Sequence, residues 1–399
     1  MYYQSIDDKS ECVGLYYDSR CVFENLDFSK LTRTWRPTQT SLEHGHIEYA
    51  WLRCHGRSLQ EVCPDSLRPD LDLALERMGA FSKALKAAKV NVSENCIFEI
   101  LPPKEFSRFL EIKNRITEHV FLNFEKPKDY GHLLDTYKVL EEIKHRKINI
   151  DFSELRRDSY REKNRKFLDL LKSAKKCVSY NLFGTKTGRL TVDRGFFPIL
   201  TLDRDLRKYV KPNNDFFVEI DFNGAEIRTL LALLEKEQPE VDIHDWNAEN
   251  VYRGLVTREE AKKRFFSWLY NPASDDYLSS RTYNRDAIKE KFWDGEKVKT
   301  PFNREIYSDE YHCINYTLQS VSNDICLEQA KKVYNLLKDK KSKISFLMHD
   351  SIILDSSLED KDDIKNVFEI FQKTRFGKYM ANIKVGKNFG EMRDLNWKL

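Results

Sequence analysis

The sequence of 399 residues has no internal repeat, no low-complexity tract, no signal peptide and no apolar run long enough to cross a membrane. Its charges nearly cancel, because 67 lysines and arginines stand against 64 aspartates and glutamates, which leaves a net charge of +3. The total charge therefore does not indicate a nucleic-acid partner, and the local distribution of charge matters more. A hydrophobic content of 41% predicts a soluble globular protein, and the chain length allows two or three domains or one large multi-lobed unit.

The eight cysteines include no pair with CxxC spacing. The simplest interpretation is that all of them are free thiols in a reducing cytoplasm. The segment 44–63 gathers potential zinc ligands, namely His44, His46, Cys54, His55 and Cys63. Their spacing fits no standard zinc finger or ribbon, so a half-buried strand and helix is the favoured expectation for this segment.

Two apolar segments are expected to form strands that each end near an aspartate. DFFVEIDF (215–222) is bounded by turn-forming residues, and KISFLMHDSIILD (343–355) is typical of two strands folded about a central HDS. Asp221 and Asp350 each sit at a strand end, where a carboxylate is costly unless something satisfies it. Either one alone could be a capping or turn aspartate. Together they suggest a shared Mg²⁺ site of the two-metal kind that serves displacement at phosphorus.

The segment TREEAKKRFFSWLYN (257–271) is expected to be a helix that begins with a capping box. Arg258, Lys262, Phe266 and Tyr270 recur every four residues and therefore share one face. In one interpretation the aromatic rings are core and the cations are solvated. In the other, this face meets a ligand with a polyanionic end and a flat end.

Seven motifs, in order, resemble those of family A DNA polymerases, the family of bacterial DNA polymerase I and of phage replicative enzymes. DFNGAEIR (221–228) is similar to motif A, VDIHDWNAENVY (241–252) to the DIH segment, and 257–271 to the O-helix. The remaining matches are TGRL (187–190), INYTLQSVSND (314–324), MHDS (348–351, the place of motif C) and VGKNFGEM (385–392). The resemblance covers about residues 177–399 and points to a compact, phage-type polymerase core without an exonuclease domain.

The fold implied by this resemblance is α+β, a right-hand polymerase with an antiparallel-sheet palm, helical fingers and a helical thumb. The implied division is 1–95 as an N-terminal region of unknown role, 96–176 as a thumb-like helical region, 177–239 as the first part of the palm, 240–305 as the fingers and 306–399 as the second part of the palm. The basic helix around 161–176 would track DNA phosphates, although a solvated helix face explains the same charges.

The resemblance also implies the catalytic groups. Asp221 and Asp350 would hold two Mg²⁺ ions, which Mn²⁺ can replace, with a backbone carbonyl near Phe222 as another ligand. One ion would activate the primer 3′-hydroxyl, and the other would neutralise the leaving pyrophosphate. Lys262 would act as a general acid that protonates the pyrophosphate.

A second implied group binds the incoming nucleotide: Phe222, Glu226, His244, Arg258, Lys262, Phe266 and Tyr270. The cations and His244 would grip the triphosphate, Phe266 would pack near the sugar and base, and Tyr270 would stack at the template position. Glu226 resembles a sugar gate that leaves no room for a ribose 2′-hydroxyl. The alternative is an exposed helix glutamate paired with a cation.

A third implied group touches the primer–template: Arg189, Arg228, Asn315, Gln319 and His349. Arg189, Asn315 and Gln319 would contact the minor groove, where every base pair offers acceptors. His349 would contact the primer terminus. The implied partners are primer–template DNA, dNTPs and a processivity or replisome protein, with no membrane. The implied location is the cytoplasm, that of the host cell if the protein is viral.

The sequence departs from the family pattern in several places. Ser351 replaces the usual Glu of motif C, Asn271 replaces a Gly after the O-helix, and Tyr311 stands where Arg is frequent. GFFPILTLD replaces the usual PNLQNIP after TGRL. The first ~95 residues are too few for a proofreading exonuclease of usual domain size.

Two alternatives to a DNA polymerase stay open at this point. A phage-type single-subunit RNA polymerase also carries an HDS motif, but Glu226, the DIH segment and Phe266 oppose it. A non-catalytic nucleic-acid clamp on a degenerate polymerase fold is opposed by the retention of Asp221 and Asp350 together with the O-helix cations.

Overall fold

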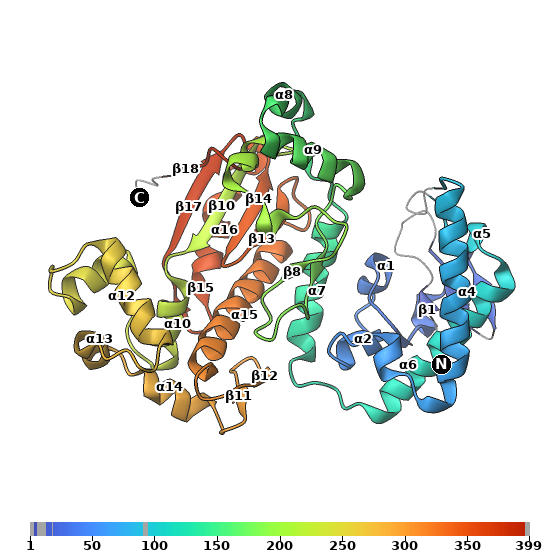
Figure 1. Cartoon of the computed structure of the whole chain (residues 1–399), viewed down its shortest axis with the longest axis horizontal. Helices are drawn as coiled ribbons and strands as arrows, with labels where there is room; N and C mark the ends of the chain where they lie inside the picture. The colour runs from blue at the N-terminus through green and yellow to red at the C-terminus, as the bar shows by residue number, and fades with distance from the viewer. Residues whose placement is uncertain (1–3, 6–12, 18, 91–94, 396–399) are drawn as a thin grey trace. The chain divides into compact units, whose positions relative to one another are not determined.

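The computed structural model describes residues 4–5, 13–17, 19–90 and 95–395 of the chain (Figure 1). It divides the chain into two compact units, Met1–Tyr137 and Lys138–Leu399. The boundary falls inside helix α7 (Tyr130–Lys144), so the helices of the range 96–176 are shared between the two units. None of the described helices combines the length and the apolar character that crossing a membrane requires.

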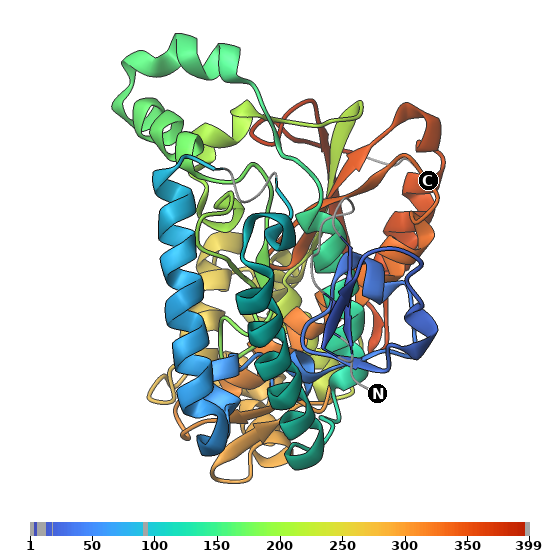
Figure 2. The same cartoon turned by 90° about the vertical axis from the view of Figure 1, so that its right-hand side faces the viewer.

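The first unit is built around two long helices, α4 (Arg68–Ala87) and α6 (Pro103–Asn123), which pack against each other (Figure 2). Phe106 and Leu110 lie one helical turn apart on α6 and pack with Tyr16 and Leu101 in a buried cluster. The other elements are β1 (Gln4–Ser5), β2 (Leu15–Tyr17), β3 (Arg20–Val22), β4 (Arg33–Thr34), α1 (Gln39–Leu42), β5 (Glu48–Tyr49), α2 (Ala50–Arg53), α3 (Leu59–Val62) and α5 (Ile97–Ile100).

The histidine- and cysteine-rich segment forms a short strand, β5, that runs directly into α2, so the expected half-buried strand and helix is confirmed. His44 stacks on Phe28 with ring centroids 4.8 Å apart, and Cys54 is buried. Among the described residues, no three His, Cys, Asp or Glu side chains come together as a metal site.

Cys96 forms a disulfide bond, so the expectation that all eight cysteines are free thiols is wrong for this residue. The thiols that the structure records as free are those of Cys21, Cys54, Cys63, Cys177, Cys313 and Cys326. Cys12 lies outside the described residues. Spacing along the chain could not reveal the bond because a disulfide depends on how close two cysteines are in space.

The second unit is organised by a five-stranded antiparallel sheet with the order β13-β14-β10-β17-β18. Its strands are β10 (Phe216–Phe222), β13 (Lys343–Met348), β14 (Ser351–Ser356), β17 (Ala381–Gly386) and β18 (Arg393–Asp394). The strands expected from 215–222 and 343–355 are therefore confirmed. Helices α15 (Cys313–Leu336) and α16 (Asp363–Gln372) pack together, and Phe222 of β10 stacks on Phe371 of α16 with centroids 4.3 Å apart. Because successive side chains of a strand alternate between its faces, Asp221 projects from the face opposite to that of Phe222.

A group of shorter helices follows β10. They are α10 (Ala225–Leu233), α11 (Ile243–Trp246), a π-helical turn (Asn247–Val251), α12 (Arg258–Tyr270), α13 (Tyr277–Thr282) and α14 (Arg285–Phe292). Helix α12 buries Phe265, Trp268 and Leu269, and the ring of Phe265 lies 4.8 Å from that of Tyr283. The core face of α12 is thus distinct from the face that carries Arg258, Lys262, Phe266 and Tyr270, which removes the interpretation of Phe266 as core.

The remaining elements of the second unit are short. They are β6 (Asn149–Ile150), α8 (Phe152–Arg157), α9 (Glu162–Ser173), β7 (Tyr180–Asn181), β8 (Thr191–Val192), β9 (Val210–Lys211), β11 (Lys297–Lys299), β12 (Glu305–Tyr307), β15 (Lys373–Thr374) and β16 (Gly377–Lys378). The basic helix expected around 161–176 is α9.

Candidate active site

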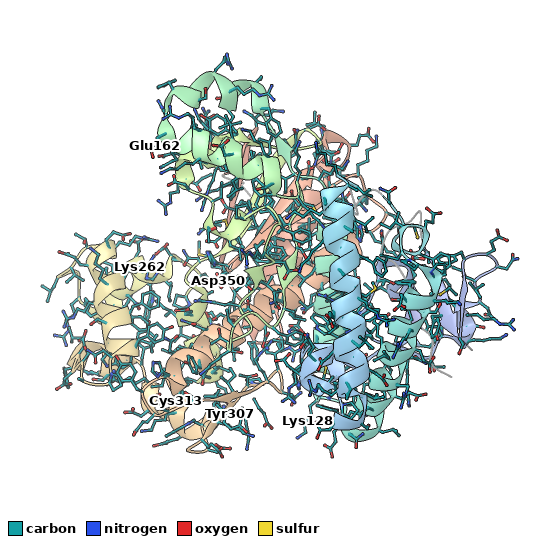
Figure 3. The ribbon with its side chains drawn as sticks, turned by 45° about the vertical axis from the view of Figure 1, so that its right-hand side comes forward. Lys128, Glu162, Lys262, Tyr307, Cys313 and Asp350 are labelled. Carbon is teal, nitrogen blue, oxygen red and sulfur yellow. The ribbon has the colours of Figure 1, made fainter. Side chains whose placement is uncertain are left out.

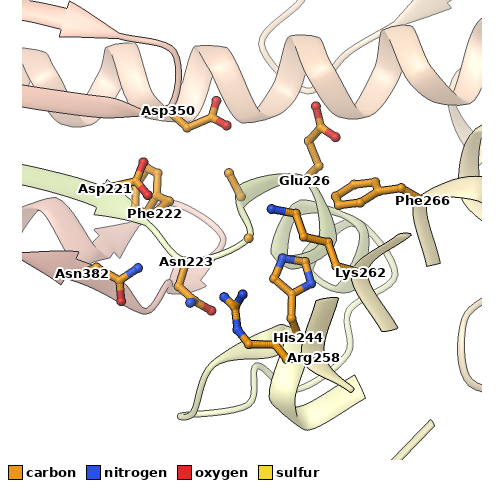
Figure 4. Close-up of a pocket in the computed structure, with 12 residues that line it drawn as sticks. Asp221, Phe222, Asn223, Glu226, His244, Arg258, Lys262, Phe266, Asp350 and Asn382 are labelled. Carbon is orange, nitrogen blue, oxygen red and sulfur yellow. The ribbon is translucent and has the colours of Figure 1, made fainter. Parts of the chain in front are cut away.

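An open cavity of about 320 Å³ lies where the end of β10, the β13–β14 turn and helices α10, α11 and α12 meet (Figure 4). It is lined by Asp221, Phe222, Asn223, Gly224, Ala225, Glu226, His244, Arg258, Lys262, Phe266, Asp350 and Asn382. Every predicted catalytic residue and all the predicted nucleotide-binding residues except Tyr270 are in this set. Figure 3 shows how Lys262 on α12 and Asp350 at the β13–β14 turn flank the same region of the unit.

Two carboxylates stand at the sheet end of the cavity. Asp221 is the sixth residue of β10, and Asp350 sits in the turn between β13 and β14, where its carbonyl accepts a 3.4 Å hydrogen bond from the Phe222 amide. Burial raises the pKa of Asp221 to about 7, and the negative charge of Asp350 adds to this shift. Burial likewise raises the pKa of Asp350 to about 6, although the positive charge of Arg189 opposes the shift.

These raised pKa values mean that protein cations do not neutralise the two carboxylates in full. A divalent cation with oxygen ligands fits such a pair, because it stabilises both ionised groups at once. The residues present therefore fit the Mg²⁺ site that the sequence predicts.

The cationic end of α12 faces the cavity from the opposite side. The capping box is present, because the Thr257 hydroxyl and the Glu260 carboxylate each accept the other's backbone amide. Arg258 donates to Asp242 through Nε at 3.2 Å and through Nη2 at 2.8 Å. This bidentate pair fixes the guanidinium beside the cavity.

His244 is 4% exposed and lines the cavity with its Nδ1 lacking any hydrogen-bond partner. Burial and the positive charge of Lys262 lower its pKa to about 4, so the imidazole is neutral. Its ring lies 6.1 Å from that of Phe266. A buried nitrogen without a hydrogen-bond partner is costly, so this ring is held in place at the expense of one unmade hydrogen bond.

Glu226 is held by two partners rather than solvated. Arg189 Nη2 donates to its Oε1 at 2.7 Å, the Tyr270 hydroxyl donates to its Oε2, and the side chain is only 14% exposed. The ring of Tyr270 in turn stacks on Phe266 with centroids 5.9 Å apart. Glu226 is therefore fixed in the wall of the cavity, which excludes the alternative of an exposed helix glutamate.

Four of the five residues predicted for the primer–template are at least partly exposed and lie outside the lining of this cavity. Arg189 and His349 line a small recess next to it, and burial together with the charges of Arg189 and Arg207 lowers the pKa of His349. Asn315 and Gln319 are one turn apart on α15 and half-buried, and Asn315 Oδ1 has no hydrogen-bond partner.

Arg228 is the one predicted site residue that the structure places elsewhere. It is fully buried, and it donates to the carbonyls of Asn223 at 2.7 Å, Pro239 at 2.9 Å and Val241 at 2.8 Å. A guanidinium committed to these carbonyls cannot reach DNA. Arg228 is a structural residue that secures the loop leading into α11, and the prediction of a primer–template contact is wrong for it.

Several residues that support the site were not predicted. Asn223 accepts from the Ile243 amide at 2.9 Å and donates to Asp242 at 2.7 Å, which ties motif A to the start of α11. Asp242 is thus shared by Asn223, Arg258 and the amides of α11. Asn223 and Asp242 lie inside the matched motifs 221–228 and 241–252. Membership of these motifs is the only signal in the sequence that could have identified them.

Ser351, which replaces the motif C glutamate, is 3% exposed, and its hydroxyl donates to the Met348 carbonyl at 2.9 Å. It closes the turn that presents Asp350.

No family model matches the chain. An alignment 264 residues long, which covers 52% of this chain and 29% of the other protein, shows 25% identity to the DNA polymerase I of Borreliella burgdorferi. A solved structure, the POL domain of Pol1 from M. smegmatis in complex with DNA primer–template and dNTP, matches with a TM-score of 0.61 at 12% identity over 95% of this chain and 92% of that one. The chain therefore shares the fold of that POL domain.

The expected α+β architecture with an antiparallel sheet is confirmed. The cavity of Figure 4 lies at the end of that sheet, and it combines paired carboxylates with a helix face of cations and aromatic rings.

Proposed function

We propose that the chain is a template-directed DNA polymerase that extends a primer 3′-hydroxyl with dNTPs and releases pyrophosphate. The observation that carries this proposal is the cavity itself, which places Asp221 and Asp350 opposite Arg258, Lys262 and Phe266. Carboxylates at one end suit metal ions and a reacting phosphate, and cations at the other end suit the outer phosphates. In this proposal the sheet region is the palm, 240–305 the fingers, and the helices α8 and α9 part of a thumb that tracks DNA phosphates.

The cofactor in this proposal is Mg²⁺. Asp221 and Asp350 would hold it, with the backbone carbonyl of Phe222 as a further ligand. When bound, it supplies activation of the 3′-hydroxyl and neutralisation of charge on the leaving pyrophosphate.

The protein's own groups would bind and orient the nucleotide. Arg258 and the neutral imidazole of His244 would hold the triphosphate, and Lys262 would hold a proton ready for the leaving pyrophosphate. Phe266 would pack against the sugar and base, and Tyr270 would stack at the template position.

The choice between DNA and RNA synthesis rests on Glu226. Its two partners, Arg189 and Tyr270, hold it rigidly, so a ribose 2′-hydroxyl would meet a fixed carboxylate rather than a side chain that can move away. This supports dNTPs as the substrates and disfavours the RNA polymerase alternative. Arg189, Asn315, Gln319 and His349 would contact the primer–template. The proposed location is the cytoplasm.

The test is a primer-extension assay with Mg²⁺ and either dNTPs or NTPs. We expect extension with dNTPs only, and no extension by Asp221→Ala or Asp350→Ala, although both variants should bind primer–template nearly as well as the native chain because cations dominate affinity for DNA phosphates. Extension by either variant would remove the assignment of the carboxylates. Extension with NTPs at a similar rate would favour the RNA polymerase, and binding without extension by the native chain would favour the clamp.

A further inference from the structure

Three neighbouring strands place polar side chains in one row across the sheet. In the antiparallel register Asp221 of β10 lies opposite Ser351 of β14 on one side and opposite Asn382 of β17 on the other. Residues directly opposite each other project from the same face of a sheet, with Cβ atoms roughly 4.5–5.5 Å apart. Asp221 therefore has one polar neighbour on each side.

The two neighbours are used differently. Ser351 is buried and commits its hydroxyl to the Met348 carbonyl. Asn382 is half-buried, lines the cavity, and forms no side-chain hydrogen bond within the described part of the chain (Figure 4). Asn223, the other asparagine of this cavity, is fully occupied by Asp242, Ile243 and Arg228. Asn382 is thus an uncommitted amide beside a buried carboxylate.

An amide oxygen is a suitable ligand for a hard divalent cation. Mg²⁺ demands near-octahedral coordination by oxygen atoms and usually keeps several waters, so it needs more oxygen atoms than two carboxylates provide. The terminal amide torsion of asparagine is soft, so Asn382 can turn its oxygen toward Asp221 at little cost. Position 351 carries no glutamate, and the hydroxyl of Ser351 is bonded to the Met348 carbonyl, so this position supplies no oxygen ligand to the cavity.

We propose that Asn382 belongs to the cation site, where its amide oxygen is a further ligand beside Asp221, either directly or through one bound water. The inference rests on the proposed function because it needs a cation at Asp221. It goes beyond that function because it assigns a third side chain to the site from a strand that carries none of the predicted site residues.

The test measures Mn²⁺ binding to the metal-free full chain, without DNA or nucleotide, by electron paramagnetic resonance. Asn382→Leu keeps the size of the side chain and removes the oxygen, and Asn382→Asp keeps the oxygen and adds a negative charge. We expect about tenfold weaker binding for Asn382→Leu, in the range seen when outer partners of metal sites are removed. We expect tighter binding for Asn382→Asp. The matched control is Asn250→Leu, because Asn250 is exposed and only donates to the Trp246 carbonyl at 3.0 Å.

Asp221→Ala separates this inference from the function on which it rests. If Asp221→Ala loses Mn²⁺ binding while Asn382→Leu stays within twofold of the native chain, the role of Asn382 is overturned and the proposed function stands. If Asp221→Ala binds Mn²⁺ as the native chain does, the cation site of the proposed function fails, and this inference fails with it. If Asn382→Leu does not fold, Asn382→Asp decides, because binding no tighter than native would overturn the proposal.

Discussion

In the proposed function, Phe266 is the side chain that would discriminate between incoming sugars. Its ring lies between His244 and Tyr270, with centroids 6.1 and 5.9 Å away, and it lines the cavity. A 3′-hydroxyl on the incoming sugar can bond to its own phosphate, and a phenyl ring offers no substitute for that bond.

Phe266→Tyr is therefore expected to erase most of the discrimination against dideoxynucleotides while leaving normal incorporation near its native rate. The added hydroxyl replaces a charge-assisted hydrogen bond of roughly 1.5–3 kcal/mol, which corresponds to about one to two powers of ten in discrimination. Competition between matched normal and dideoxy substrates on one template measures the ratio. A ratio that does not move would mean that Phe266 does not face the sugar.

Asp221 and Asp350 illustrate the opposite situation, in which function costs stability. Burial and mutual repulsion raise the pKa of Asp221 to about 7, well above its value of about 3.9 in an unfolded chain. Between these two values the folded state binds more protons than the unfolded state. The stability of the metal-free protein should therefore fall as pH rises from about 4 to 7.

Asp221→Asn should consequently raise the free energy of unfolding of the metal-free protein at pH 8, by on the order of 1–3 kcal/mol, because it removes a buried negative charge. At pH 4 the variant should show no gain, since the native carboxyl is then protonated in the folded state. Thermal unfolding in a chelator at both pH values measures the difference. An equal shift in melting temperature at pH 4 and pH 8 would contradict this account.

Ser351 is a further case in which burial decides the outcome. Ser351→Glu restores the usual motif C residue, but it would bury a carboxylate opposite Asp221 and remove the hydrogen bond to Met348. We expect loss of stability and of extension rate, whereas Ser351→Ala should cost only about 1 kcal/mol. Denaturant unfolding and single-turnover extension of both variants measure this. A Ser351→Glu rate near native would show that the site tolerates a third carboxylate.

Among the elements, the turn 185–190 is held by contacts with residues far away in the sequence. Gly188 has φ +80°, its carbonyl accepts from Asn323 Nδ2 at 2.9 Å, and a Cβ there would lie 2.6 Å from the Arg304 guanidinium. Arg304 in turn donates to the fully buried Asp324 at 2.8 Å. The turn is thus fixed by Asn323 of α15 and by Arg304, which precedes α15 in the chain. This fixed turn places Arg189 where it donates to Glu226.

Gly188→Ala should lower the free energy of unfolding by about 3 kcal/mol more than Gly195→Ala does. The additional loss arises because the new methyl group displaces Arg304 from its buried partner Asp324. Gly195 has φ +86° but nothing within 4 Å of its Cβ position, so its variant bears only the backbone strain, roughly 1 kcal/mol. Denaturant unfolding of the two variants makes the comparison. Equal losses would show that the approach of Arg304 does not matter.

The elements also show what sequence can predict. Strand β10 and helix α12 were predictable because an apolar run and a capping box act locally, and Asp221 and Lys262 follow from their positions on them. Arg228 was misassigned because a motif gives the position of a side chain along a helix but not the carbonyls folded around it. The hydrogen bonds between Asp242 and Arg258 join two elements, and the disulfide of Cys96 requires a second cysteine close in space. Neither feature leaves a pattern in the neighbouring sequence from which it could be predicted.

On the scale of the whole molecule, several acids of the first unit are paired with cations, as many acids of the second unit are. The ion pairs of the first unit include Arg77–Glu105 at 2.6 Å, Arg108–Asp70 at 3.2 Å and Lys126–Glu48 at 2.5 Å. Carboxylates neutralised in this way hold elements together. They do not resemble Asp221 and Asp350, which are buried close to each other.

We therefore predict that the full chain does not degrade single-stranded DNA in the 3′→5′ direction with Mg²⁺ or Mn²⁺. An end-labelled oligonucleotide incubated with the Asp350→Ala variant, which removes synthesis, measures this. Degradation that disappears when a carboxylate of the first unit is replaced would contradict the prediction.

The strand order of the central sheet also bears on how the protein is made. Strand β10 carries FFVEIDF and lies between β14 and β17, yet both of these neighbours follow it in the chain by more than a hundred residues. On the ribosome, β10 therefore emerges with two unpaired edges and waits for its partners while the intervening helices are translated. Apolar strands with open edges are templates for aggregation. The arrangement that brings Asp221 and Asp350 together thus leaves an apolar strand open to aggregation until the rest of the chain has been translated.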